Sequence, residues 1–152
     1  MPPLRLKKQL DTLNGPSSMN PIKLTARKSM NKKELTKEDM EKKLQERARK
    51  IFSLSSKICT LDLAHAFCRL SGHVKTIDCV INPIDATYTG AHDPTIPVAR
   101  LEVRLDFFEH MNQLDARKAF DSRMVEIGRY TRTLNRIIRA GQPVTQSSEL
   151  AA

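Results

Sequence analysis

Residues 98–107, Val-Ala-Arg-Leu-Glu-Val-Arg-Leu-Asp-Phe, form the most regular pattern in this sequence of 152 residues. Apolar and charged side chains alternate strictly along it: Leu101, Val103, Leu105 and Phe107 alternate with Arg100, Glu102, Arg104 and Asp106. A period of two residues predicts a β-strand with one face in the core and the other in water. Such one-sided burial is typical of an antiparallel sheet.

A second strand is expected just upstream, because residues 73–81 are rich in β-branched side chains and end at Asn82-Pro83. A long loop, residues 83–97, then leads to the alternating strand. Two strands alone make a marginal sheet. We therefore expect either a third short strand around Ala86–Thr89 or a sheet that continues across a homodimer.

Three helices are expected to accompany the strands. Residues 37–56 follow a capping-box pattern, Thr36 with Asp39, and their apolar residues Met40, Leu44, Ala48, Ile51 and Phe52 recur at helical spacing. Residues 61–70 are predicted as a shorter helix, capped by Thr60 and ended by Ser71-Gly72. Residues 109–139 are predicted as a long amphipathic helix, with an apolar face of Phe120, Met124, Ile127, Tyr130, Leu134, Ile137 and Ile138.

Together these elements predict an α+β fold: two N-terminal helices, an antiparallel β-hairpin with a long loop, and a long C-terminal amphipathic helix. We expect a single domain over residues 34–140, preceded by a flexible arm over residues 1–33 and followed by a polar tail over residues 141–152. The arm has too few apolar side chains to offset the entropy of ordering it, so it is expected to be disordered until it meets a partner.

Positive charge is concentrated near the amino terminus. The formal net charge is +9 at pH 7, and residues 1–50 hold 14 Lys or Arg against 6 Asp or Glu. A basic arm on a nearly neutral body favours an acidic partner, most often nucleic acid.

A second basic feature lies on the long helix. Arg129, Arg132, Arg136 and Arg139 fall within roughly 80° of one another around a helix and span about 15 Å of its length. The planar guanidinium suits bidentate contact with phosphate, and this length matches several phosphate spacings. The remaining predicted nucleic-acid-binding residues lie on the first helix: Lys42, Lys43, Arg49 and Lys50. The alternative for the arginines is a solvated outer face, favoured near a helix C-terminus by the helix dipole.

Residues 61–81 resemble a helix-turn-helix in the placement of Leu63, Ala64, Phe67, Val74 and Ile77 around Leu70-Ser71-Gly72. The resemblance implies that residues 73–81 are a recognition helix and that residues 98–107 belong to the wing of a winged-helix regulator. Against it, residues 73–81 have the composition of a strand.

A zinc site is a further alternative, because Cys59, His65, Cys68, His73 and Cys79 are close in sequence. No Cys-x2-Cys or His-x3-His pair is present, however, and Cys68 and Cys79 occupy positions that suit apolar residues. We therefore expect no metal.

Catalytic motifs are also missing from the sequence: there is no G-x-S-x-G, Gly-rich phosphate loop or H-E-x-x-H. The nearest groups for acid–base chemistry are Asp85, His92 and Asp93 in the long loop, where such residues also serve turns. We expect a protein that is not an enzyme and has no cofactor.

The sequence thus predicts a non-enzymatic nucleic-acid-binding accessory protein whose partner is DNA, RNA or another polyanion. The alternatives are a structural or assembly subunit of a virion or ribonucleoprotein particle, and a winged-helix-like transcriptional regulator; a bacterial or phage origin would suit them.

Three cysteines and the lack of a long apolar run favour the cytoplasm and no membrane partner. A mitochondrial presequence is the alternative for residues 1–33. The apolar face of the long helix favours a homodimer that forms through this helix.

Overall fold

The computed structural model of this chain describes residues 34–88 and 95–149. The elements are α1 (Lys37–Thr60), β1 (His65–Ser71), β2 (Thr76–Asn82), β3 (Ala99–Arg104), α2 (Gln113–Ala140) and α3 (Gln146–Glu149). This is the mixed α+β architecture that the sequence predicts. The predicted flexible arm, residues 1–33, lies outside the described residues.

Helix α1 begins as expected and ends later than expected. The Thr36 hydroxyl accepts a hydrogen bond from the Asp39 amide, and the Asp39 carboxylate accepts one from the Thr36 amide, which completes the capping box. The helix runs past residue 56 to Thr60 and then stops because Asp62 adopts a left-handed conformation with φ 50°. The Leu63 amide there donates to the Ile58 carbonyl at 3.1 Å, which satisfies one of the last helical carbonyls.

The prediction of a helix over residues 61–70 is wrong, because most of this segment is strand β1. Its apolar residues fit helical spacing by coincidence: Phe67 points out of the sheet while Cys68 points into the core. The helix-turn-helix interpretation fails for a related reason. Residues 73–81 comprise the end of a hairpin turn and most of β2, so they supply no recognition helix.

The sheet has three antiparallel strands in the order β1-β2-β3. Cys79 in the middle of β2 is opposite Cys68 on one side and Leu101 on the other, which fixes the register. The third strand is therefore β1, and the alternative near Ala86–Thr89 is wrong: Ala86 to Tyr88 have no regular structure, and Thr89 is outside the described residues.

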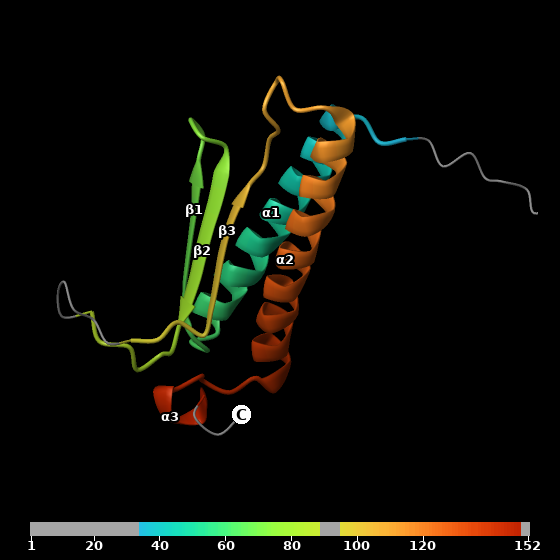
Figure 1. The fold of residues 1–152 in the computed structure, drawn as a ribbon. Coiled ribbons are helices and arrows are strands. Elements are labelled where there is room, and N and C mark those ends of the chain that lie inside the picture. The colour runs from blue at the N-terminus through green and yellow to red at the C-terminus, as the bar shows by residue number, and fades with distance from the viewer. Residues whose placement is uncertain (1–33, 89–94, 150–152) are drawn as a thin grey trace, which may run out of the picture. The chain divides into compact units, whose positions relative to one another are not determined.

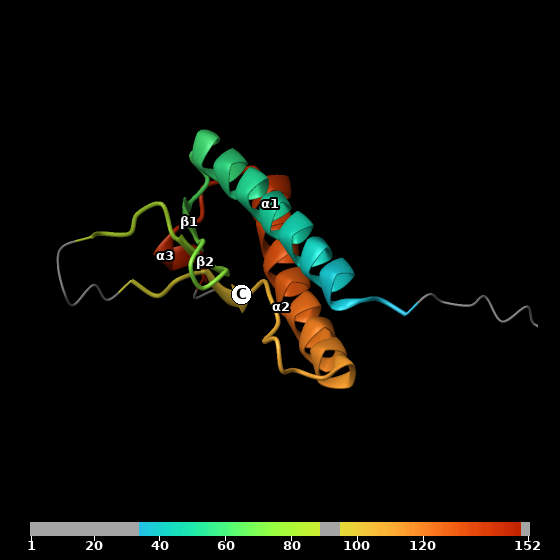
Figure 2. The same ribbon diagram turned by 90° about the horizontal axis from the view of Figure 1, so that it is seen from above.

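Both long helices cover one face of this sheet and leave the other face open (Figure 1; Figure 2). Helix α1 packs along β1 and α2 along β3. The core between the layers includes Met40, Leu44, Ile51 and Ile58 of α1, Ile77, Cys79 and Ile81 of β2, Leu101 and Val103 of β3, and Phe120, Ile127, Leu134 and Ile137 of α2. The apolar stripe of α2 is thus covered within the chain, which removes the reason for expecting a homodimer through this helix.

The segment after α2 folds back onto the sheet. Gly141 ends the helix with a φ of 63°, a left-handed conformation that glycine adopts at low cost. The Val144 amide then donates to the Leu63 carbonyl at 2.8 Å, and the Val144 carbonyl accepts from the Ile84 amide at 2.8 Å. The Gln146 amide donates to the Asp85 carboxylate at 3.0 Å. Residues 144–146 of the predicted polar tail are thus tied to the ends of the sheet.

Candidate nucleic-acid interface

The four arginines predicted on the last helix lie on the outer surface of α2. Arg129, Arg132, Arg136 and Arg139 are all exposed, and the inner side of the same turns carries the buried Tyr130, Leu134 and Ile137. None of the four lies within 4.0 Å of a carboxylate in the part of the chain that the structure describes. Their guanidinium groups are therefore available to an external anion.

The four basic residues predicted on α1 are also exposed, but they form two rows. Lys42 and Arg49 are seven residues apart and so lie on nearly the same line along the helix, as do Lys43 and Lys50. The two rows are separated by roughly 100° around the helix axis. They therefore make a broad basic surface, unlike the narrow row on α2.

The fold places the two helices side by side and pointing the same way (Figure 1; Figure 2). Near their first turns, the Lys37 ammonium donates to the Glu109 carbonyl at 3.2 Å, and the Gln113 amide group donates to the Leu35 carbonyl. Because the helices are parallel, their C-terminal halves lie at the same end of the molecule.

These C-terminal halves are free of acids. Residues 47–60 and residues 127–140 each contain four basic residues and no Asp or Glu. We call these two segments the basic helix halves; their cations are Arg47, Arg49, Lys50, Lys57, Arg129, Arg132, Arg136 and Arg139. All eight are exposed. Arg47 and Lys57 are members that the sequence reasoning missed, while Lys42 and Lys43 lie in the N-terminal half of α1 among its four acids.

Arginines on the open face of the sheet have a different environment, because each is paired with an acid. Arg69 of β1 lies 3.6 Å from the Asp78 carboxylate, and Arg100 lies 3.8 Å from Glu102. Arg104 donates to the Asp106 carboxylate at 2.5 Å, and this contact raises the pKa of Arg104 and lowers the pKa of Asp106. Positive charge on this face is largely balanced.

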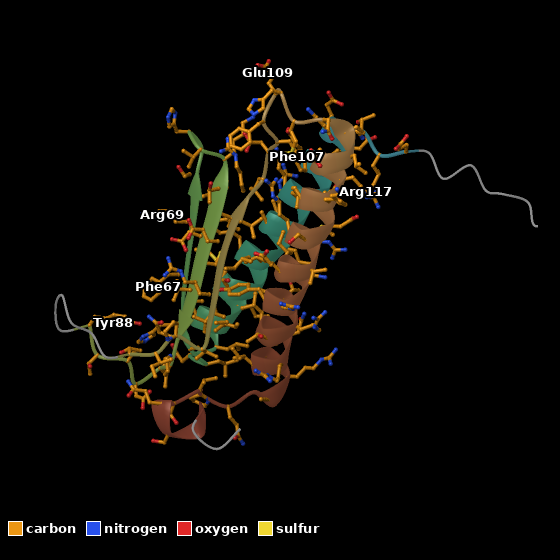
Figure 3. The ribbon with its side chains drawn as sticks, in the orientation of Figure 1. Phe67, Arg69, Tyr88, Phe107, Glu109 and Arg117 are labelled. Carbon is orange, nitrogen blue, oxygen red and sulfur yellow. The ribbon has the colours of Figure 1, made fainter. Side chains whose placement is uncertain are left out.

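The open face also carries an aromatic cluster that the sequence did not reveal. The Tyr88 hydroxyl contacts His65 Nδ1 at 2.9 Å and accepts from the Asn82 amide at 3.2 Å. The ring of Phe67 meets that of Tyr88 edge to face, with centroids 5.8 Å apart. Figure 3 shows Phe67 and Arg69 projecting from β1 away from the helices. Phe67 and Tyr88 are 54% and 52% exposed, so the cluster is a surface feature.

A pocket of about 230 Å³ adjoins the α1 surface, between that helix and the β1–β2 turn. Its walls include Phe52, Leu70 and Leu105, and two cations, Arg49 and Lys75, contribute to its lining. The pocket is therefore mainly apolar, with positive charge at two points of its lining.

The structure gives no support to the two alternatives considered from the sequence, a zinc site and a group for acid–base chemistry. Of the five Cys and His residues considered for zinc, Cys68 and Cys79 are in contact. Among the described residues, however, no three His, Cys, Asp or Glu side chains are placed to hold a metal ion. Asp85 binds the Gln146 amide, while His92 and Asp93 lie outside the described residues.

No known protein family matches this sequence, and no curated protein or solved structure shows significant similarity to it. None of the described helices is both long and apolar enough to cross a membrane.

Proposed function

We propose that this protein is a non-enzymatic nucleic-acid-binding protein of the cytoplasm and that the basic helix halves are its ordered phosphate-binding surface. The observation that carries the proposal is the lack of acidic partners for the four α2 arginines in the described part of the chain, beside a second acid-free helix half. Cations without partners lose little when they bind phosphate, because no ion pair has to be broken first.

The geometry supports backbone contacts more than base recognition. The four α2 arginines span about 15 Å of one helix, a length that covers several phosphates of a nucleic-acid strand. Contacts of this kind fix position on a duplex and carry no sequence information. The protein is therefore expected to bind DNA or RNA with little sequence preference.

An assembly subunit of a virion or ribonucleoprotein particle is the second candidate. The aromatic cluster of His65, Phe67 and Tyr88 favours it, because Phe67 and Tyr88 are exposed and aromatic residues are enriched at protein–protein interfaces. In that case the open face would contact a protein and the basic helix halves would contact the packaged nucleic acid or another polyanion.

The proposal is tested by comparing two variants that remove the same net charge. One replaces Arg132 and Arg136 with Gln on α2, and the control replaces Arg69 and Arg100 with Gln on the open face. Binding to a fluorescent duplex of mixed sequence is measured by anisotropy over a range of salt concentrations.

The α2 variant is expected to reduce the slope of log K against log salt by about 1.8, since each lost phosphate contact on B-DNA removes about 0.9. The open-face control is expected to keep the wild-type slope. Equal changes in both variants would show that net charge alone attracts the duplex, and no binding at about 50 mM salt would reject the proposal.

A further inference from the structure

Two cysteines face each other across the first two strands, on the side of the sheet that the helices cover. Cys68 of β1 and Cys79 of β2 are direct partners in the antiparallel register, and their sulfur atoms are 2.6 Å apart. Residues opposed in this way have Cα atoms about 4.5–5.5 Å apart, which lies inside the range of about 4.4–6.8 Å that disulfides require. No backbone movement is therefore needed to join the two sulfurs.

Ser55 of α1 completes the cluster. Its hydroxyl oxygen lies 3.3 Å from the Cys68 sulfur, and its side chain is buried. Once Cys68 has lost its proton, both the Cys79 thiol and the Ser55 hydroxyl can donate to its sulfur. The Cys79 contact, with a smaller contribution from Ser55, lowers the pKa of Cys68 to about 7, while the same contact and burial raise the pKa of Cys79.

The two cysteines also differ in access to solvent. Cys79 is fully buried and Cys68 is half-buried. An oxidant from solution therefore meets Cys68 first, with Cys79 behind it. A partly exposed thiolate next to a second thiol is the arrangement found in cysteines that sense oxidants.

We propose that Cys68 and Cys79 form a redox-active pair that hydrogen peroxide converts to an intrachain disulfide, with Cys68 as the attacking and Cys79 as the resolving residue. The Cys68 thiolate attacks one oxygen of the peroxide, the O–O bond breaks, and the departing hydroxide takes a proton to become water. The Cys79 sulfur then attacks the resulting Cys68 sulfenic acid, loses its proton and releases a second water. Two thiols are oxidised and one peroxide is reduced.

The disulfide bond would join β1, which pairs with β2 alone among the described strands, covalently to the centre of the sheet.

The test uses Cys59→Ser, which removes the exposed third cysteine and leaves the pair. The folded protein is treated with peroxide, unfolded and alkylated with iodoacetamide. Mass spectrometry then gives the number of alkylated cysteines. We expect the monomer to lose both alkylation sites together and to regain both after treatment with dithiothreitol. A Cys59→Ser, Cys79→Ala variant is expected to accumulate a Cys68 sulfenic acid that dimedone traps.

Two results would overturn the inference. One is loss of a single thiol in Cys59→Ser, with Cys79 still open to alkylation and Cys68 oxidised further. The other is a disulfide that forms only between molecules. The Cys59→Ser, Cys68→Ala variant is the matched control, because it also lacks one cysteine of the pair but keeps Cys79 instead of Cys68. We expect Cys79 in this variant to react with peroxide at least about tenfold more slowly than Cys68 does in the Cys59→Ser, Cys79→Ala variant.

Discussion

The outer face of the helices and the open face of the sheet both carry arginine, but they use it differently. On the sheet, Arg69, Arg100 and Arg104 each lie beside a carboxylate. On the basic helix halves, the α2 arginines have no such neighbour in the described chain. The same residue type therefore serves internal pairing on one face and leaves free cationic groups on the other, a difference that a charge count does not show.

The cause is geometric. In the sheet, the register places Asp78 of β2 opposite Arg69 of β1. Arg100 and Arg104 each lie beside the acid two residues farther along the chain. On a helix, pairing needs an acid three or four residues away. The acids of α1 and α2 lie in the first halves of the helices, where Arg117 pairs with Asp121 and Lys118 with Asp115. Arg132, Arg136 and Arg139 have no acid at that spacing, and Glu126, three residues before Arg129, does not lie within 4.0 Å of it.

The largest effect is expected where the basic surface rests on the core. Leu134 is 0% exposed and lies on the inner side of the turns that carry the arginines. Replacing it with Ala is expected to lower the free energy of unfolding by about 2–5 kcal/mol, through lost burial and a residual cavity. Urea unfolding followed by circular dichroism measures it.

Phe67→Ala on the open face is the control for Leu134→Ala. Phe67 is half-exposed, and its ring contact with Tyr88 is worth about 0.5–1.5 kcal/mol, so a smaller loss is expected. Equal losses in the two variants would mean that α2 is not anchored as described and that its arginines do not stand on a rigid surface.

A smaller effect is expected from combining changes on the two helices. Arg49→Gln with Lys50→Gln on α1 should reduce the salt slope of duplex binding by at most about 1.8, as two phosphate contacts would. If the basic helix halves act as one surface, joining this pair to the α2 pair adds the two reductions, measured by the same anisotropy titration. If the combined variant reduces the salt slope no more than the α2 pair does, α2 alone contacts the phosphates.

The smallest expected effect is a loss of stability at low pH through Asp106. The Arg104 hydrogen bond lowers the pKa of Asp106 in the folded state, so its stabilising contribution is present above the unfolded-state pKa and is lost as the pH falls through the folded-state value. Urea midpoints measured from pH 7 downward should fall more steeply in the wild type than in Asp106→Asn. Arg104→Gln should flatten the profile in the same way, and a wild-type profile in either variant would contradict this assignment.

Helices and strands with strong local signals could be predicted from the sequence. The capping box at Thr36 and the apolar spacing from Met40 onward predicted α1, and strict alternation predicted β3. Strand β1 was mistaken for a helix because its apolar residues do not alternate: Phe67 and Leu70 lie on opposite faces of the sheet and are both exposed.

The α2 arginines of the candidate site could be predicted from the sequence, but Arg47, Lys57 and the surface that the two helices form together could not. Exposure of Arg129 to Arg139 followed from their position opposite the apolar stripe. The parallel direction of α1 and α2 depends on the number of strands between them, and three strands bring the acid-free halves to one end where two would not. The Tyr88 cluster likewise depends on His65 and Asn82 being opposed in the register.

The return of the chain after Gly141 has a consequence for the order of folding. Val144 bonds to Leu63 at the entry to β1 and to Ile84 beyond the end of β2, so two ends of the sheet depend on a residue made after all three strands and α2. During synthesis from the amino terminus the sheet and helices can assemble first, but these closing contacts wait for residues 144–146 to leave the ribosome. The ends of the sheet are thus held by residues that are synthesised after every strand and both long helices.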